Sequence, residues 1–412
     1  MCKLIPSVLG LATASLMACG GVPPGLEDPA VDSDAVTGES THLDPLAAPA
    51  DDPNVAALSD DALETSAQTT APVAARRRAW FANYNRGETL DYLNAPYTTT
   101  DGDPRFPRAA RHNFHQDVAY GPHPRNRLDV WSIDRRRPAP VVVYIHGGGF
   151  VGGSKEQVHL PRNTVPRLLA AGLSVVSINY RYGYEDPDAA LLATNPDDEG
   201  SINDVNGTRL DYILRDCARA IQFLRYRAAE LNIDPTRIGV YGNSAGAGCA
   251  TWVGTVEDLA VRNHPDPVLR ESTRIQAVGH TNGQSTYAYS RWPELLQMDP
   301  DFVYENMNSV RMTQMTQDDL FSSAEGQRLE AVMDYYQAMD QGDPPFITIN
   351  DNPDLDQSQI TDANQVIHHP RGHVALYERC VAMSMDCTIR TLDRQEGPDD
   401  DVRAFMVRVL AP

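Results

Sequence analysis

The sequence predicts an α/β fold with a doubly wound, mostly parallel sheet. Short apolar runs, which are typical of buried parallel strands, alternate along the chain with longer segments of helical periodicity. Two of these runs lead directly into glycine-containing turns, at 147–149 and 242–246. Because parallel strands are joined by crossover helices, this alternation favours helices on both faces of one sheet.

The expected elements follow one another in the order that such a sheet requires. β-Branched and aromatic residues mark the strands, and apolar residues at helical spacing mark the helices. We expect a hairpin at 112–120 and 127–133, strands at 141–145, 173–180, 237–241, 275–279, 346–349 and 387–392, and helices at 158–171, 210–231 and 245–257.

Composition separates a tether from the folded part of the chain. Residues 20–78 contain eleven Asp or Glu and, before Arg76, no Lys or Arg. Such a segment buries too little apolar area to offset its ordering entropy, so we expect a disordered acidic tether. The remaining residues, 79–412, are predicted to form one domain with cap insertions near 183–208 and 284–343.

Length and charge limit the classes of function. The chain has 412 residues and a formal net charge of −21. This length suffices for one large α/β domain with appendages. Because the chain is acidic and has no basic patch, we expect no nucleic-acid partner.

The first 19 residues predict export. Their apolar run is too short to span a bilayer, and it ends in Leu16-Met17-Ala18-Cys19-Gly20. This ending resembles the lipobox of bacterial lipoproteins, which implies cleavage before Cys19 and a membrane anchor of diacylglycerol on its thiol. No Asp follows Cys19, which by the same resemblance implies the outer membrane. The alternative is an ordinary secretory signal, which would leave the protein periplasmic or secreted.

The turn Gly242-Asn243-Ser244-Ala245-Gly246 lies between a predicted strand and a predicted helix. The turn is sharp, so the residues two before and two after Ser244 must be small. It lifts the Ser244 hydroxyl clear of the sheet, at a helix N-terminus whose N–H groups face developing negative charge. Strand, Gly-x-Ser-x-Gly and helix are the context of a nucleophile elbow, and Ser244 is therefore the candidate nucleophile.

A second glycine-rich turn follows the strand expected at 141–145. It reads His146-Gly147-Gly148-Gly149-Phe150. Consecutive glycines let the backbone turn its N–H groups outward, where a side chain would clash. Together with the N–H that follows the nucleophile, such groups form an oxyanion hole.

The chain from about Arg111 onward resembles the α/β-hydrolase fold, specifically the carboxylesterases of the hormone-sensitive-lipase and feruloyl-esterase-like groups. The resemblance is carried by four blocks: 146–150, Asn179-Tyr180-Arg181, 232–238 and 242–246. It implies that the oxyanion-hole donors are the N–H groups of Gly148, Gly149 and Ala245, and that His146 is structural.

The resemblance also implies an acid about five residues past the strand at 346–349. Asp354 fits this position, and Asp362 is the main alternative, with Asp351 and Asp356 also close by. An acidic loop that is merely solvated remains the competing interpretation for each.

The base is where the chain departs from the family, because no histidine follows the last expected strand. The remaining candidates are His368, His369 and His373, near the start of the helix before that strand. We expect His373 to take the proton from Ser244, because it lies about one helical turn past His369 and Gly372 leaves space beside it.

Four cysteines remain beyond the leader. Cys380 and Cys387 are predicted to form a disulfide, because six intervening residues let the chain turn back and export favours oxidation. Cys217 and Cys249 are predicted to be buried thiols. None of the four has the spacing of a zinc site, and we expect no metal or organic cofactor.

The sequence thus predicts a serine hydrolase of small-molecule carboxylic esters that works through an acyl-enzyme on Ser244. The alternative is a binding protein of the same fold that has lost its catalytic histidine. The motifs do not separate esterase from peptidase chemistry, and they name neither the acyl nor the alcohol group.

Overall fold

A computed structural model describes residues 89–159, 164–183, 208–307 and 309–411, together with residues 75 and 77. All of them belong to one compact unit, Leu63–Pro412. The predicted leader, Cys19 and nearly all of the predicted tether lie outside the described residues, as does most of the insertion expected near 183–208. Within the described part, no helix is long and apolar enough to cross a bilayer.

Arg77, in the last residues of the predicted tether, contacts the folded domain. Arg77 is buried, and its guanidinium lies 2.9 Å from the carboxylate of Glu257. It also donates a hydrogen bond of 3.1 Å to the carbonyl of Ala331. This arginine, near the end of the predicted tether, is thus bound to the folded domain through a carboxylate and a carbonyl.

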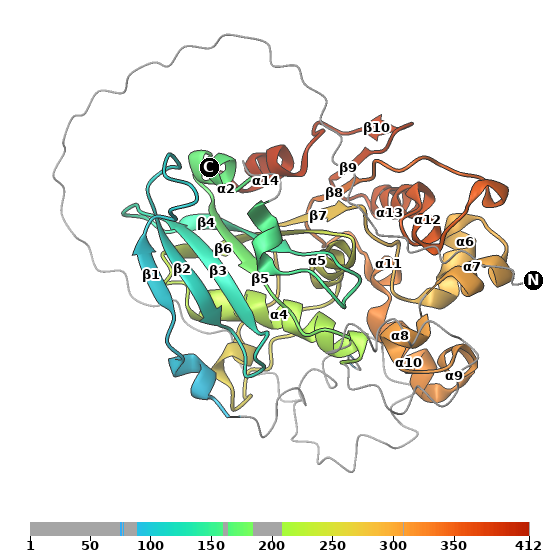
Figure 1. The fold of residues 1–412 in the computed structure, drawn as a ribbon, viewed down its shortest axis with the longest axis horizontal. Coiled ribbons are helices and arrows are strands. Elements are labelled where there is room, and N and C mark those ends of the chain that lie inside the picture. The colour runs from blue at the N-terminus through green and yellow to red at the C-terminus, as the bar shows by residue number, and fades with distance from the viewer. Residues whose placement is uncertain are drawn as a thin grey trace, which may run out of the picture. The chain divides into compact units, whose positions relative to one another are not determined.

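A ten-stranded sheet forms the centre of the domain, in the order β1-β2-β3-β5-β4-β6-β7-β8-β9-β10. The neighbours from β5 to β9 pair in parallel. At the two edges, β1, β2 and β3 pair antiparallel and β3 pairs antiparallel with β5, and β10 pairs antiparallel with β9. The predicted mostly parallel α/β sheet is confirmed (Figure 1).

The strands are β1 (Thr98–Asp101), β2 (His112–Ala119), β3 (Arg127–Ile133), β4 (Ala139–Ile145), β5 (Ser174–Ile178), β6 (Ile233–Asn243), β7 (Ala277–Thr281), β8 (Phe346–Ile349), β9 (Cys387–Arg390) and β10 (Gln395–Glu396). The α-helices are α2 (Thr164–Ala170), α4 (Leu210–Tyr226), α5 (Ala245–Thr255), α6 (Trp292–Leu296), α7 (Pro300–Asn306), α8 (Ser309–Thr313), α9 (Gln317–Ser322), α10 (Ala324–Met333), α11 (Tyr335–Ala338), α12 (Ala363–Ile367), α13 (Pro370–Ala382) and α14 (Val402–Leu410). Short 3-10 helices are η3 (Asp91–Asn94), η4 (Lys155–His159), η6 (Pro267–Arg270), η7 (Tyr289–Arg291) and η8 (Gln357–Gln359).

Helices cover both faces of the sheet, as the doubly wound pattern predicts. Successive side chains of a strand point to opposite faces. In β4, Val141, Val143 and Ile145 join the core that includes α4 and α5, whereas Val142 and Tyr144 join the core that includes α2 and α14. Figure 1 shows α4 on one side of the strands and α2 and α14 on the other.

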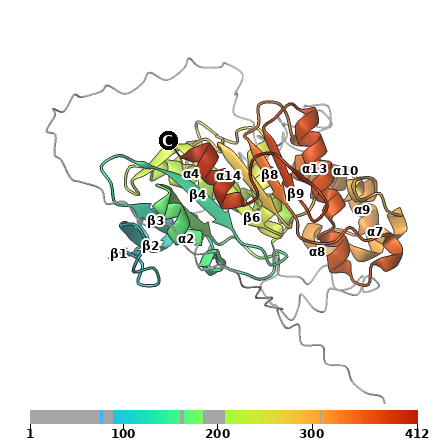
Figure 2. The same cartoon turned by 90° about the horizontal axis from the view of Figure 1, so that it is seen from above.

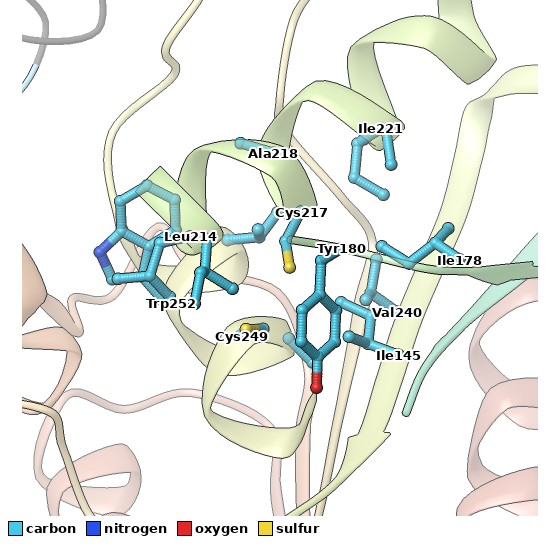
Figure 3. Close-up of a cluster of buried hydrophobic side chains, with 14 of the residues drawn as sticks. Ile145, Ile178, Tyr180, Leu214, Cys217, Ala218, Ile221, Val240, Cys249 and Trp252 are labelled. Atoms are coloured by element: carbon cyan, nitrogen blue, oxygen red, sulfur yellow. The ribbon is translucent and has the colours of Figure 1, made fainter. Parts of the chain in front are cut away.

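The core beneath the serine turn is apolar and tightly filled. Figure 3 shows Ile145 and Val240 of the sheet facing Leu214 and Cys217 of α4 and Trp252 of α5. All five side chains are buried. Because α5 begins directly after Ser244, this packing fixes the position of the helix start at the edge of the sheet.

The segment between β7 and β8 forms the helical insertion expected near 284–343. It contains η7 and α6 to α11. Helices α6 and α7 lie beside α12 and α13 in Figure 1, and Figure 2 shows the insertion at the same end of the domain as α13. Helix α6 contacts α13, α7 contacts α12, and α11 contacts α5. The insertion therefore packs on the same helices that carry the site described next.

Candidate active site

Ser244 occupies a strained turn between β6 and α5. Its backbone has φ 52° and ψ −120°, a conformation that residues other than glycine rarely adopt. A Cβ atom on Gly242 would lie 2.2 Å from the carbonyl carbon of Gly246, and one on Gly246 would lie 2.1 Å from the carbonyl oxygen of Ile145. The two glycines are therefore required by close backbone approach, as the motif predicts.

The glycine loop lies directly beside this turn. A Cβ atom on Gly147 would come within 3.2 Å of the Cβ atom of Ser244. Gly148 and Gly149 have φ of 116° and 58° and are exposed. Among the described residues, no backbone carbonyl accepts a hydrogen bond from the N–H of Gly148, Gly149 or Ala245. These three N–H groups are thus available to bind an oxyanion near Ser244.

His146 supports the glycine loop and does not face the serine. Its ring stacks on Tyr180 with centroids 4.2 Å apart, and its Nδ1 lies 2.7 Å from the carbonyl of Gly147. The Tyr180 hydroxyl donates to the carbonyl of His146 at 2.9 Å. Burial lowers the pKa of His146 to about 4, so the ring is neutral at neutral pH.

The side chain that contacts the candidate nucleophile is His368. Its Nε2 lies 2.8 Å from the Oγ of Ser244. His368 is the residue between the end of α12 and the N-cap of α13, and its Nδ1 lies 3.1 Å from the carbonyl of Asn364. A carbonyl accepts only, so Nδ1 carries the proton and Nε2 presents its lone pair to the Ser244 hydroxyl.

Burial lowers the pKa of His368 below its usual range, and the Asn364 carbonyl opposes this shift. The neutral imidazole is therefore the form present at neutral pH, and it is the form that can accept the serine proton.

The prediction that His373 contacts Ser244 is wrong. His373 lies inside the first turns of α13 and is fully buried. Its Nδ1 lies 2.6 Å from the Oγ1 of Thr348 on β8, and its Nε2 lies 3.1 Å from the carbonyl of Gly283. The helix turns this residue inward onto the sheet, so both ring nitrogens are occupied there.

His369, the third candidate, also points elsewhere. It is the N-cap of α13, where its Nδ1 accepts a 3.3 Å hydrogen bond from the backbone N–H of Arg371. Its Nε2 lies 3.0 Å from the carbonyl of Leu355.

The predicted acid does not reach the base. Asp354 accepts a hydrogen bond of 2.9 Å from Arg371, and the histidine nearest to it is His369, at 3.8 Å. Asp362, the alternative, caps α12 through the backbone N–H groups of Asn364 and Gln365.

The other two carboxylates have partners of their own. Asp351 pairs with Arg390, and Asp356 pairs with Arg371. Among the described residues, the hydrogen-bond partners of the His368 ring are Ser244 and the Asn364 carbonyl, and neither is a carboxylate. A backbone carbonyl thus occupies the place at Nδ1 that a triad gives to an acid.

From the sequence, His368 is named as a candidate base but His373 is chosen, and Asn364 is not considered. Pro370, which occupies the first position of α13, could have separated the two histidines. Proline favours the first helical position, so His368 precedes the helix and His373 lies within it. The role of Asn364 rests on its backbone carbonyl, which no side-chain motif records.

The cysteines lie as predicted. Cys380 and Cys387 form a disulfide that joins α13 to β9, with Cα atoms 6.2 Å apart. Cys217 and Cys249 are buried free thiols on α4 and α5. In the described part of the chain, no group of His, Cys, Asp and Glu side chains is arranged to hold a metal ion.

A large cavity lies away from the serine. It has a volume of about 750 Å³ and is lined by residues of the insertion and by Thr255 and Glu257. Thr255 is the last residue of α5, whereas Ser244 precedes the first. The eleven residues of α5 separate Thr255 from Ser244, and neither Ser244, His368 nor the glycine loop lines the cavity.

Two protein-family comparisons match this region. The model of the carboxylesterase family matches residues 126–258, which include the glycine loop and the serine turn. The BD-FAE family model matches residues 206–355, from the segment before α4 to the loop after β8. Residues 126–355 are thus similar to carboxylesterases of the α/β-hydrolase type, each model matching about a third of the chain.

Curated esterases are similar to parts of the chain. The fumonisin B1 esterase of Sphingopyxis macrogoltabida is 34% identical over 122 residues, which are 29% of this chain and 21% of that protein. A probable isoprenylcysteine alpha-carbonyl methylesterase of Oryza sativa subsp. japonica is 29% identical over 163 residues, which are 39% of this chain and 33% of that protein. The chain therefore spans a fifth to a third of the length of these curated relatives.

A solved structure shares the fold of this domain. A bifunctional GH43-CE protein of Bacteroides eggerthii superposes with a TM-score of 0.50 at 20% identity, over 72% of this chain and 38% of that chain. At this level of identity the likeness shows the fold alone.

Proposed function

We propose that the protein hydrolyses carboxylic esters through an acyl-enzyme on Ser244, with His368 as the base. The observation that carries the proposal is the 2.8 Å contact between Ser244 Oγ and His368 Nε2. A serine hydroxyl is a weak nucleophile near neutral pH unless a base lies within hydrogen-bond reach, and His368 supplies one.

The proposed reaction has two halves. His368 Nε2 removes the hydroxyl proton as Ser244 Oγ attacks the ester carbonyl, and the N–H groups of Gly148, Gly149 and Ala245 bind the oxyanion. The protonated imidazole gives its proton to the leaving alcohol, and an acyl-enzyme remains. Water, deprotonated by the same imidazole, then releases the acid and restores Ser244.

The Asn364 carbonyl takes over one task of an acid, which the described residues do not supply to the His368 ring. By accepting from Nδ1–H it holds the tautomer in which Nε2 is free to act as a base. A carbonyl carries only a partial negative charge, so it stabilises the imidazolium less than a carboxylate does. We expect a working esterase whose chemical step is slower than that of a complete triad.

The test uses p-nitrophenyl acetate and a fluorophosphonate probe. Ser244→Ala should abolish both turnover and labelling, and His368→Ala should lower both by about 100-fold or more. His159→Gln is the matched control, because the His159 ring packs against Phe106 and Trp131 and is not a partner of Ser244 or His368. A wild-type protein that neither reacts with the probe nor hydrolyses the ester would replace this proposal with the binding-protein alternative.

The substrate is proposed to be a small-molecule carboxylic ester. The support is the family, together with relatives that are named as esterases of a fumonisin and of an isoprenylcysteine methyl ester. A panel of esters that vary separately in acyl length and in alcohol size would assign the two sides of the substrate. Parallel assays with peptide amides would separate esterase from peptidase activity.

We also propose that the protein is exported and anchored through lipid on Cys19. The support is the leader Leu16-Met17-Ala18-Cys19-Gly20, together with a disulfide, which favours an oxidising compartment. Mass spectrometry of the mature N-terminus should find an acylated cysteine, and Cys19→Ser should release the protein from membranes. A mature N-terminus elsewhere would contradict the lipid anchor.

A further inference from the structure

Two side-chain amides hold the carbonyl group of His368. The Nδ2 of Asn350 donates to it at 3.1 Å, and the Nδ2 of Asn352 donates to it at 3.0 Å. Both asparagines lie in the loop that follows β8, at the edge of the sheet where Ser244 lies. One backbone carbonyl, between α12 and α13, therefore accepts from two donors of the loop that follows β8.

The orientation of the Asn350 amide is set by its other partner. Its Oδ1 accepts a 2.8 Å hydrogen bond from the backbone N–H of Asn352. A backbone N–H can only donate, so the amide oxygen must face it and Nδ2 must face His368. Asn350 is fully buried, and its own N–H donates to the carbonyl of Arg390 on β9 at 2.9 Å. We call the two amides the Asn350–Asn352 pin. Through Asn350 the pin is attached to the end of β8 and to the neighbouring strand β9.

The backbone of His368 is held from the other side by α12. Its N–H donates to the carbonyl of Asn364 at 3.0 Å, and that same carbonyl lies 3.1 Å from its ring Nδ1. With N–H and carbonyl both fixed, the position of Nε2 depends only on the two torsions of the side chain. The Asn364 carbonyl restrains those torsions as well.

We propose that Asn350 and Asn352 are positioning residues that hold His368 in register with Ser244. The inference rests on the proposed function of the Ser244–His368 pair. A triad fixes its histidine through a carboxylate, and the ring of His368 has none among its described partners. The two amides fix the backbone instead, and a displacement of about 1 Å would break the contact on which proton transfer depends.

The decisive variant is Asn352→Asp, which keeps the size of the side chain and exchanges the amide donor for an acceptor. Asn352 is half-buried, so the exchange leaves no cavity. We expect kcat for p-nitrophenyl acetate to fall about 10- to 100-fold, with KM changed less than about twofold. The kcat of Asn352→Ala should fall by a similar factor. A side chain that only fills space would lose activity in the alanine variant and keep it in the aspartate variant.

Asn232→Asp is the matched control. The Nδ2 of Asn232 also donates to two backbone carbonyls, those of Ile133 and Arg135, at 3.1 and 2.9 Å. It is half-buried and immediately precedes β6, the strand whose other end leads into Ser244. The Asn232→Asp variant should lose about as much stability as Asn352→Asp does, while its kcat stays within about twofold of wild type. If kcat of Asn352→Asp is likewise within twofold of wild type, the positioning role is refuted.

A second readout does not depend on turnover. The ring ¹⁵N signals of His368, assigned by comparison with His368→Gln, should show one tautomer with the proton on Nδ1 in the wild-type protein. Asn352→Asp should show a mixture of tautomers. Unchanged signals in Asn352→Asp would refute the positioning role, whether or not the protein has esterase activity. A lack of esterase activity in the wild-type protein would refute the proposed function but not the positioning role.

Discussion

Gly148 and Gly149 are adjacent in the glycine loop but differ in how much space surrounds them. A Cβ atom on Gly148 would lie 2.3 Å from the carbonyl oxygen of Gly152, at a φ of 116°. A Cβ atom on Gly149 would have no atom within 4 Å, at a φ of 58°. The first site demands glycine for two reasons, and the second only for its backbone conformation.

Gly148→Ala should therefore displace the loop and remove oxyanion donors. We expect a fall in kcat of about 100- to 1,000-fold with a folded protein, as judged by circular dichroism. Gly149→Ala, in the αL region where alanine costs about 1 kcal/mol, should lose less activity. Equal losses of kcat in Gly148→Ala and Gly149→Ala would show that the glycine loop does not act through the position of its N–H groups.

The pKa of His368 predicts how activity depends on pH. The neutral ring is the form that we propose acts as the base, and burial lowers its pKa from the ordinary value of 6.5. Activity should therefore be present at neutral pH and disappear as pH falls through a midpoint below 6.5. The measurement is kcat/KM for an ester without ionisable groups between about pH 4 and pH 8. A midpoint at or above the ordinary value would contradict a buried, neutral base.

At this scale the sequence predicts what is local and misses what depends on tertiary placement. Ser244 and its glycines are predicted because one turn dictates all of them. The choice of His373 over His368 fails because it depends on where α13 begins. A histidine before the helix lies at the sheet edge near Ser244, whereas one inside its first turn points inward onto the sheet. The Asn364 carbonyl and the Asn350–Asn352 pin arise only when α12 is folded against the end of β8.

Among the elements, strands are predicted more closely than helices. The strand expected at 346–349 is observed as β8 (Phe346–Ile349), because a buried β-branched run has clear ends. The helix expected at 158–171 is observed as η4 and α2, with residues 160–163 outside the described part. Strands β1 and β10 and helix α14 were not predicted, since short edge strands and terminal helices give weak periodicity.

The Cys380–Cys387 disulfide ties the end of α13 to the start of β9. It closes a short loop, so a change of both cysteines to serine should lower the free energy of unfolding by about 2–3 kcal/mol. Urea denaturation of the oxidised wild type, the reduced wild type and the double variant checks this. Because His368 lies before α13, the double variant should keep most of its esterase activity at low temperature. An equal stability of all three proteins would contradict the prediction.

At the scale of the whole molecule, buried histidines predict acid sensitivity. Burial lowers the pKa of His146 to about 4 and that of His280 to about 3, and it lowers the pKa of His373 well below its usual range. These rings stay neutral in the fold but bind protons in the unfolded chain once pH falls below about 6.5. Each therefore costs up to about 1.4 kcal/mol of stability per pH unit below that value.

Protonation of Asp343 has the opposite effect on stability to that of the buried histidines. Burial raises its pKa to about 7, so the fold binds a proton that the unfolded chain releases, and this group adds stability as pH falls toward about 4. These three histidines and Asp343 together give a loss of roughly 2 kcal/mol between about pH 7 and pH 5.5, and His368, whose pKa burial also lowers, adds to it. Urea titrations at the two pH values measure it. Asp343→Asn should steepen the loss, and an unchanged slope would show that Asp343 does not take up a proton.

The position of His368 also bears on how such enzymes are recognised in genomes. A search that requires a serine, an acid and a histidine in that order, with the histidine past the last strand, will pass over a chain whose histidine follows β8. A better signature joins the serine turn to Asn350-Asp351-Asn352 and then His368-His369-Pro370. Sequences that lack a C-terminal histidine but carry this spacing would then be tested as hydrolases rather than set aside as inactive relatives.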